Sequence, residues 1–227
     1  MREIPQSVKL ISYTKPNEYM TLEQLIAYTA RVSSDRENKT AQPEKLLSYM
    51  LKNKHWSPFE MVNICFEITT SRAIGRQLLR HDMGFQELSQ RYKELDDTII
   101  EFDLRVAGDS NRQGSRRPTN SEYVKLSAIR DIFADNILMA FSAYKEAVAA
   151  GVATECARAI LPEQAATVIY ANTTLRNWLS FLNVRLDKHA QLEIREIANM
   201  IAEQVAVLFP TVYSATNNFN NHDGLFM

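Results

Sequence analysis

A dense run of polar side chains between Arg72 and Tyr92 could bind an anion. Arg72, Arg76 and Arg80 recur every four residues, so on a helix their guanidinium groups share one face. Gly84 then allows the backbone to approach a ligand closely, and further polar side chains follow at Gln86, Glu87, Ser89 and Arg91. Guanidinium forks match phosphate oxygens, whereas amides and carboxylates match imide groups. The spacing predicts either an anion site or a solvated network of salt bridges, and it does not distinguish the two.

A second polar cluster follows in residues 164–189. We expect a helix over 164–185, with a buried apolar stripe of Leu175, Trp178, Leu179 and Leu182 beside a polar stripe of Arg176, Ser180 and Asn183. A polar stripe of this kind marks either the solvent boundary of a core helix or the wall of a site. His189, just beyond Arg185, is either a structural group or a ligand or base. Upstream, Arg158 lies in a mostly apolar turn, so its charge needs a carboxylate or a bound anion as partner.

The elements that would position these residues can be predicted from periodicity and capping signals. Alternating apolar residues predict strands over 62–68 and 100–106, and Ser71 is a suitable cap for a helix that ends near Leu79. A capping box at Thr21 and a first-turn proline at Pro43 predict two earlier helices. In the second half, helices are expected over 121–150, 154–161, 164–185 and 188–208, after a loop over 108–120. We therefore predict an α+β fold, a single domain over 1–227 with a small antiparallel sheet and a helix-rich C-terminal half.

Composition excludes several classes of protein. The chain has 227 residues, with 26 Lys and Arg against 27 Asp and Glu, so no net charge attracts nucleic acid or an anionic membrane. No apolar run is long enough to span a bilayer, and a cytoplasmic location is the default expectation. Cys65 and Cys156 do not match a disulfide, redox or metal spacing. Dinucleotide, P-loop and zinc motifs are absent from the sequence, so no metal site is expected.

Several segments, taken together in order, resemble the flavin-dependent thymidylate synthases. The hallmark of that family is an Arg-His-Arg triplet followed by seven residues and Ser. This chain has Arg80 and His81, but Asp82 is the third residue and the interval to Ser89 is one residue shorter. Further similar segments are His55–Glu60, Arg31–Ser33, Asn111–Ser115, Ala157–Pro162, Leu175–Arg185 and His189–Gln191. The resemblance covers about residues 21 to 215.

The resemblance implies a role for each matching residue. It implies contacts with dUMP for Gln77, Arg80, Glu87, Leu88, Ser89, Gln90, Arg91, Arg158 and Arg185. Within this set, Arg91 and Arg158 are candidates for the phosphate, and Arg185 is the catalytic candidate beside the uracil imide. It implies contacts with FAD for Ser57, Arg80, His81, Asp82, Glu87, Thr174, Leu175, Arg176, Ser180 and His189.

The implied activity is the reductive methylation of dUMP to dTMP, a step of dTMP biosynthesis. Methylenetetrahydrofolate would donate the carbon, FAD reduced by NADPH would carry the hydride, and no cysteine nucleophile would take part. The resemblance also implies a homotetramer with active sites shared between subunits. An alternative is a nucleotide-binding regulator that has lost flavin chemistry. Asp82 suggests this alternative, because it replaces the third residue of the family triplet. A nucleic-acid-binding protein that uses Arg112–Arg117 is disfavoured by the neutral charge and the lack of interleaved aromatic residues.

Overall fold

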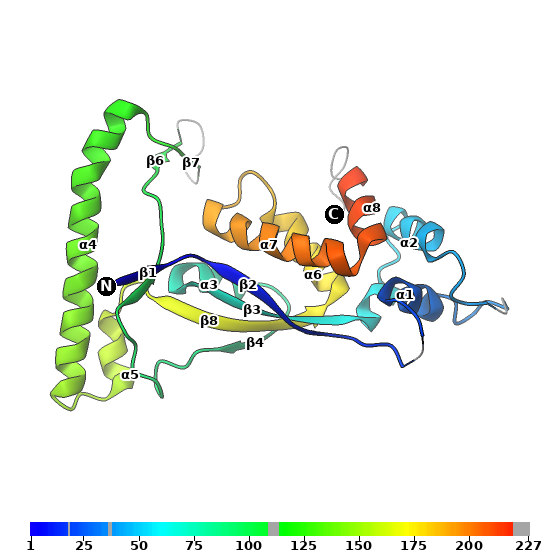
Figure 1. The fold of residues 1–227 in the computed structure, drawn as a ribbon, viewed down its shortest axis with the longest axis horizontal. Helices are drawn as coiled ribbons and strands as arrows, with labels where there is room; N and C mark the ends of the chain where they lie inside the picture. The colour runs from blue at the N-terminus through cyan, green and yellow to red at the C-terminus, as the bar shows by residue number, and fades with distance from the viewer. Residues whose placement is uncertain (18, 36–37, 109–113, 220–227) are drawn as a thin grey trace. The chain divides into compact units, whose positions relative to one another are not determined.

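The computed structural model describes residues 1–227 except 18, 36–37, 109–113 and 220–227 (Figure 1). The chain forms two compact units, each built from three segments. Unit 1 comprises Met1–Ser7, Thr69–Leu78 and Gln86–Ile169, and unit 2 comprises Val8–Ile68, Leu79–Phe85 and Tyr170–Met227. The expectation of a single domain stays a prediction.

The elements confirm the α+β class. Their order is β1 (Arg2–Ile4), β2 (Ser7–Tyr13), α1 (Leu22–Ala30), α2 (Pro43–Lys52), η1 (Ser57–Met61), β3 (Asn63–Ser71), α3 (Arg72–Leu78), β4 (Gly84–Glu87), β5 (Thr98–Ile100), β6 (Val106–Ala107), β7 (Ser115–Arg116), α4 (Asn120–Ala149), α5 (Thr154–Ala157), η2 (Arg158–Ile160), β8 (Ala166–Thr174), α6 (Leu175–Arg185), α7 (Leu192–Leu208) and α8 (Pro210–Phe219). One sheet has the strand order β2-β3-β8-β4. Of the two small pairs, β6 and β7 are antiparallel and β1 and β5 are parallel. No helix in the described ranges is long and apolar enough to cross a membrane.

Unit 1 is built around one end of the long helix α4. Ile137, Phe141 and Tyr144 are the buried residues of this helix, and they pack in a cluster with Ile99 of β5 and the segment around Leu161. The remainder of α4 keeps large apolar side chains in solvent, among them Tyr123, Val124, Ile129, Ile132, Phe133, Leu138 and Met139. A helix of 30 residues with so few buried side chains has little packing to hold it in the isolated chain.

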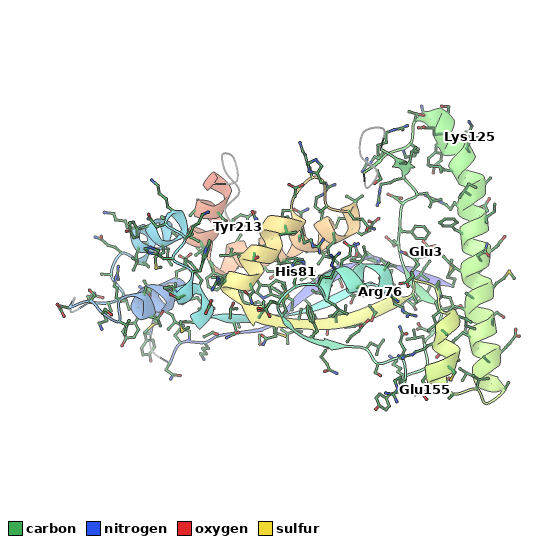
Figure 2. The ribbon with its side chains drawn as sticks, turned by 180° about the vertical axis from the view of Figure 1, so that it is seen from behind. Glu3, Arg76, His81, Lys125, Glu155 and Tyr213 are labelled. Atoms are coloured by element: carbon green, nitrogen blue, oxygen red, sulfur yellow. The ribbon has the colours of Figure 1, made fainter. Side chains whose placement is uncertain are left out.

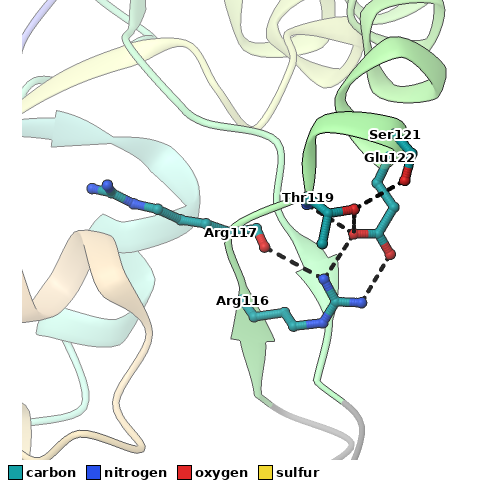
Figure 3. A network of polar contacts seen from close by, with 5 residues as sticks. All are labelled: Arg116, Arg117, Thr119, Ser121 and Glu122. Atoms are coloured by element: carbon teal, nitrogen blue, oxygen red, sulfur yellow. Dashed lines mark hydrogen bonds and ion pairs between the residues drawn. The ribbon is translucent and has the colours of Figure 1, made fainter.

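A polar network fixes the start of α4 (Figure 3). Thr119 and Glu122 form a capping box, in which the Glu122 carboxylate accepts from the Thr119 backbone amide at 2.9 Å. The Thr119 hydroxyl is also 2.9 Å from this carboxylate. The guanidinium of Arg116 donates to both Glu122 oxygens at 2.8 Å. The bidentate pair ties β7 to the first turn of the helix.

Unit 2 packs its helices around α6. Trp178 is fully buried, and its indole N–H donates to the carbonyl of Ile64 at 3.1 Å, which joins α6 to β3. Helix α6 also packs against α7 and η1, while α2 packs against α1 and α8. The predicted Thr21 capping box is confirmed, and α2 begins at Pro43 as expected.

A carboxylate near the start of unit 2 caps its last helix. Glu23 on α1 is only 7% exposed, and one of its oxygens accepts hydrogen bonds from the amides of Thr211 and Val212 at 2.8 and 3.0 Å. These amides belong to the first turn of α8, whose N–H groups have no partner within the helix. A residue from another element therefore satisfies the end of α8.

The largest error of the sequence prediction concerns residues 164–174. A helix was expected there, but residues 166–174 form β8, and the helix begins only at Leu175. Alternate residues are buried, namely Thr167, Ile169, Ala171 and Thr173, which is the period of a strand. Two of these side chains are threonines, so the apolar contrast that normally reveals a strand is weak.

Smaller differences lie elsewhere in the chain. The predicted strand over 100–106 is wrong, because β5 ends at Ile100 and β6 begins only at Val106. The predicted helix 154–161 divides into α5 and η2. The predicted helix 188–208 ends at Leu208 as expected, but it begins only at Leu192, and a further helix that was not predicted, α8, begins at Pro210. The predicted loop over 108–120 contains β7, and its residues 109–113 lie outside the described part. Ser71 caps α3 as predicted, with its hydroxyl accepting from the Ile74 amide at 3.3 Å.

Candidate active site

A polar pocket of about 570 Å³ opens in unit 2 at the start of α6. Its lining comprises Trp56, Glu60, Asp82, Thr174, Arg176, Asn177 and Ser180. The volume lies within the range of about 300–1,000 Å³ that is usual for small-molecule sites. An aromatic wall, hydroxyl and amide groups and charges of both signs make the pocket suitable for a polar ligand with a planar ring.

Buried contacts set the position of the pocket walls. Phe59, in the middle of η1, is fully buried, so it fixes Trp56 and Glu60 on either side of it. Thr174 is the N-cap of α6, and its hydroxyl accepts a hydrogen bond from the Asn177 amide at 3.3 Å. The helical period then brings Arg176, Asn177 and Ser180 to the pocket.

Two interactions connect distant segments within the pocket. The Arg176 guanidinium forms an ion pair with the Glu60 carboxylate, 116 residues away in the sequence. The Asp82 carbonyl accepts hydrogen bonds from the Asn177 side-chain amide at 2.9 Å and from the Thr173 hydroxyl at 3.1 Å. The segment after α3 is thereby anchored to β8 and α6.

A second cluster in unit 2 contains His81 and Arg185 (Figure 2 labels His81). The Arg185 Nε–H donates to Nε2 of His81 at 2.9 Å, and the imidazole packs edge-on against Phe181 with ring centroids 4.9 Å apart. Burial, reinforced by the positive charges of Arg185 and Arg80, lowers the pKa of His81 from 6.5 to about 4. Burial, and then the charge of Arg80, also lowers the pKa of Arg185. At neutral pH, therefore, a neutral imidazole holds the guanidinium in place.

The low pKa of His81 predicts a stability change in acid. The unfolded chain, with the ordinary His pKa of 6.5, binds more protons than the folded chain between about pH 6.5 and pH 4. Stability is therefore expected to fall as the pH falls through this window. Urea unfolding at pH 7 and pH 4.5 should show a smaller acid loss in His81→Gln, which keeps an acceptor but does not titrate there, than in the wild type.

The control for this measurement is His55→Gln, which removes an exposed histidine of the same unit. The control should lose stability in acid as the wild type does. Equal acid losses in the wild type and in His81→Gln would show that the protonation of His81 does not govern this transition.

Unit 1 contains a separate cluster of arginine and carboxylate groups. The Arg91 guanidinium donates to Glu155 at 3.1 Å, and the Thr154 hydroxyl donates to the Arg91 carbonyl at 2.7 Å (Figure 2 labels Glu155). These contacts join the segment after β4 to α5, which is followed directly by Arg158 in η2. Arg158 is half-buried, and no hydrogen bond or ion pair joins its guanidinium to another residue in the described ranges.

Comparison with known proteins decides the family. The family model described as "Thymidylate synthase complementing protein" matches residues 9–211. A probable flavin-dependent thymidylate synthase of Paramecium bursaria Chlorella virus 1 is 37% identical over 217 residues, which cover 92% of this chain and 98% of the viral protein. The flavin-dependent thymidylate synthase of Synechocystis sp. is 38% identical over 214 residues, with the same two coverages. The chain belongs to the flavin-dependent thymidylate synthase family.

A solved structure agrees with this family. The UMP/dUMP methylase PolB from Streptomyces cacaoi, bound with 5-Br dUMP, superposes with a TM-score of 0.81 at 25% sequence identity. The superposition covers 96% of this chain and 97% of PolB. The fold of the family is therefore present over nearly the whole chain.

The structure brings some of the predicted FAD residues together. Asp82, Thr174, Arg176 and Ser180 all line the pocket, and Ser57 begins η1 next to Trp56. Leu175 is fully buried and its amide donates to the Val62 carbonyl at 2.8 Å, so its contact with FAD stays a prediction. His189 lies outside the pocket lining, where its Nδ1 is 2.8 Å from the Asp187 carboxylate. Arg80 and His81 adjoin the pocket in sequence and belong to the Arg185 cluster.

The predicted dUMP residues of unit 1 have varied surroundings. Glu87 accepts a hydrogen bond from the Thr167 hydroxyl at 2.8 Å, and the amide of Leu88 donates to Val168 at 2.9 Å. The carbonyl of Ser89 accepts hydrogen bonds from two amides of the following turn. Gln90 is buried, and Gln77 interacts with another residue. Unit 1 therefore holds Arg91 and Arg158 on connected elements, while Arg185 and Arg80 belong to unit 2.

The arginine stripe of the first motif divides between different roles. Arg76 pairs with Glu163 at 3.1 Å, and both side chains are more than half exposed, as expected of a solvated salt bridge. Arg72 has a buried terminal nitrogen, Nη1, without a hydrogen bond in the described residues. The stripe is therefore not one uniform anion site.

Three pocket residues were not predicted. Trp56 and Glu60 lie in the segment that resembles the family's His-x-Ser/Thr-Pro-Phe-Glu motif, which was the signal that could have identified them. Asn177 follows the Thr174 cap by three residues, so its position at the mouth of the pocket depends on where α6 begins. Because the helix was expected to start at residue 164 instead of Leu175, the sequence did not indicate this position. No group of three or more potential metal ligands occurs among the described residues.

Proposed function

We propose that this enzyme converts dUMP to dTMP, with methylenetetrahydrofolate as the carbon donor and FAD reduced by NADPH. The observation that carries the proposal is the pocket at the start of α6, together with Arg185 at the other end of this helix, which donates to a neutral His81. The similarity to proteins named flavin-dependent thymidylate synthases and to PolB, solved with 5-Br dUMP, supports it. We propose that the reaction takes place in the cytoplasm.

The pocket residues fit the ring and sugar part of a flavin nucleotide. The Trp56 ring offers a stacking surface, and the Thr174, Asn177 and Ser180 side chains offer hydrogen bonds. Arg80, His81 and Ser57, together with Glu87, Leu175 and His189, are the further FAD contacts that we propose. When bound, FAD would supply hydride transfer from NADPH to the pyrimidine.

Arg185 is the residue to which we assign charge stabilisation on the substrate. A guanidinium beside the uracil imide favours the ionised form of the ring. This ionisation raises the electron density on C5, the carbon that attacks the methylene donor. His81 fixes the orientation of the guanidinium without adding a competing positive charge, because its pKa of about 4 keeps the imidazole neutral. A preorganised charge of this kind needs no rearrangement during the reaction.

The phosphate and base of dUMP would be bound by the remaining residues of the set. Arg158 is the stronger phosphate candidate, because no described residue pairs with it, whereas Arg91 must first leave Glu155. That exposed pair is worth about 0–1 kcal/mol, so the exchange is inexpensive. Gln77, Arg80, Glu87, Leu88, Ser89 and Gln90 complete the proposed dUMP set.

We propose a homotetramer with shared active sites, and the exposed apolar side chains on α4 support association between subunits. Val124 and Met139 are 73% and 69% exposed, and large contiguous apolar surfaces usually mark interfaces. Association of subunits would also bring residues of different chains to one site. Light scattering of the purified protein should give the mass of four chains.

The test of the proposed function is flavin binding combined with nicotinamide oxidation. The purified protein should bind FAD at about one per chain, and it should oxidise NADPH faster when dUMP is present. Product analysis should then detect dTMP only with methylenetetrahydrofolate. A folded protein that cannot be loaded with FAD would instead support a nucleotide-binding regulator.

The reaction is expected to proceed without a cysteine nucleophile. Burial raises the pKa of the Cys65 thiol, which makes it a poor nucleophile, and Cys156 is exposed on the short helix α5. The double variant Cys65→Ser, Cys156→Ser should therefore keep a turnover number of the same order as the wild type. Steady-state assays of the flavin-loaded variant would check this.

The control for this variant is its flavin content and circular dichroism, which should match the wild type. If turnover disappears in a variant that is folded and loaded, a thiol takes part in the reaction, and the single Cys156→Ser variant would identify it.

A further inference from the structure

The pocket at the start of α6 carries one charge that the protein itself does not neutralise. Arg176 and Glu60 form an ion pair and cancel each other. Asp82 also lines the pocket, and no described residue forms a hydrogen bond or ion pair with its carboxylate. This aspartate stands where the family triplet has its second arginine. The pocket therefore presents a net negative charge to its ligand.

The position of this carboxylate is fixed by the backbone. Both hydrogen bonds at Asp82, from Asn177 and from Thr173, go to the carbonyl oxygen. Thr173 is buried in β8, and Asn177 is held at the start of α6. The side chain is consequently left to face the pocket while its backbone is anchored at two points.

Two amides in the first turn of α6 are already engaged and do not offset this charge. Helix N-termini bind phosphate through N–H groups that lack partners in the helix. In α6, the Leu175 amide already donates to Val62, and the Asn177 amide donates to the Thr174 cap. The guanidinium of Arg176, the cation among the lining residues, is engaged by Glu60. Most of the groups at this helix end are thus already engaged, and the Asp82 carboxylate would repel a phosphate.

We propose that Asp82 makes this pocket select a neutral hydrogen-bond donor of the flavin nucleotide, a hydroxyl or an amine, and exclude its phosphates. This assignment rests on the proposed function, and it specifies which part of the cofactor the pocket receives. The Asp82 carboxylate accepts the hydrogen bond, the Trp56 ring stacks on the neighbouring planar group, and the diphosphate lies outside the pocket. Asp82 is in this sense a specificity residue for the cofactor.

The test is the direction in which FAD affinity changes when Asp82 is replaced. Asp82→Asn should weaken FAD binding by about three- to tenfold, because a charge-assisted hydrogen bond becomes a neutral one. Asp82→Arg should weaken FAD binding further, because a guanidinium cannot accept a hydrogen bond. Dissociation constants from flavin fluorescence quenching give the result without any turnover. Asp96→Asn, which removes an exposed carboxylate of unit 1, should leave FAD affinity unchanged.

The outcomes separate this inference from the proposed function. If the wild-type chain binds FAD but Asp82→Asn and Asp82→Arg bind it equally well or more tightly, the assignment of Asp82 is overturned and the function stands. If the wild-type chain does not bind FAD at all, both are overturned.

Riboflavin, which has the ribityl hydroxyls but no phosphate or adenosine, identifies the donor. A parallel loss of riboflavin and FAD affinity in Asp82→Asn supports the assignment with a ribityl hydroxyl as donor. A loss of FAD affinity alone supports it with a hydroxyl or amine of adenosine.

Discussion

Arg185→Ala is expected to lower the turnover number with dUMP by about 100-fold or more, since removing one preorganised charge-stabilising donor costs roughly that much. The affinity for dUMP should change much less, because the charge on the ring develops mainly during the reaction. The structural basis is the partly buried guanidinium at the end of α6, whose Nε lies 2.9 Å from Nε2 of His81. Steady-state assays at saturating dUMP, with dUMP affinity measured separately, provide the check.

Two further variants define the role of Arg185. Arg185→Lys keeps a charge but loses the planar fork that donates to His81, so intermediate turnover is expected. Arg195→Ala removes a half-buried guanidinium on α7 that donates to the Lys188 carbonyl, and it should behave as the wild type. Wild-type turnover in Arg185→Ala would remove this residue from the catalytic set.

Arg158→Ala should weaken dUMP binding by about ten- to a hundredfold and leave FAD affinity unchanged. One charge-assisted contact with phosphate is worth roughly 1.5–3 kcal/mol, which corresponds to that range. Because no described residue pairs with Arg158, its removal leaves no buried carboxylate behind. Calorimetric titration with dUMP and with FAD measures both effects.

Arg91→Ala is the matched comparison for Arg158→Ala. Its guanidinium is committed to Glu155 in the free protein, so a smaller loss of dUMP affinity is expected. If Arg158→Ala instead weakened dUMP and FAD binding equally, Arg158 would be a structural residue of η2.

Local signals predicted the elements whose ends are set by neighbouring residues. The Thr21 box, the Pro43 start and the Ser71 cap act over three or four residues, and all three were confirmed. Strand β8 was missed because its place between β3 and β4 is a tertiary feature. A sequence window containing alanine, threonine, valine and isoleucine is compatible with either a helix or a strand until those neighbours are known.

Only the part of the site that lies on a single helix could be predicted from the sequence. Arg176 and Ser180 share a face of α6, so their common location follows from helical spacing. The pairing of Arg176 with Glu60 joins residues 116 positions apart, and no local pattern specifies it. The bond from Arg185 to His81 likewise joins α6 to the segment after α3, and it became visible only in the structure.

The Glu23 cap of α8 has a consequence for how unit 2 opens. The 7% exposed Glu23 carboxylate holds the Thr211 and Val212 amides, so unfolding of the first turn of α8 would break two charge-assisted hydrogen bonds of α1 at once. Opening of the first turn of α8 is therefore coupled to α1. The first and last helices of the unit should exchange their amide hydrogens at one common rate, as a single cooperative foldon, although 188 residues separate Glu23 from Thr211. Removing the chain from Pro210 onward would accordingly loosen a helix near the opposite terminus.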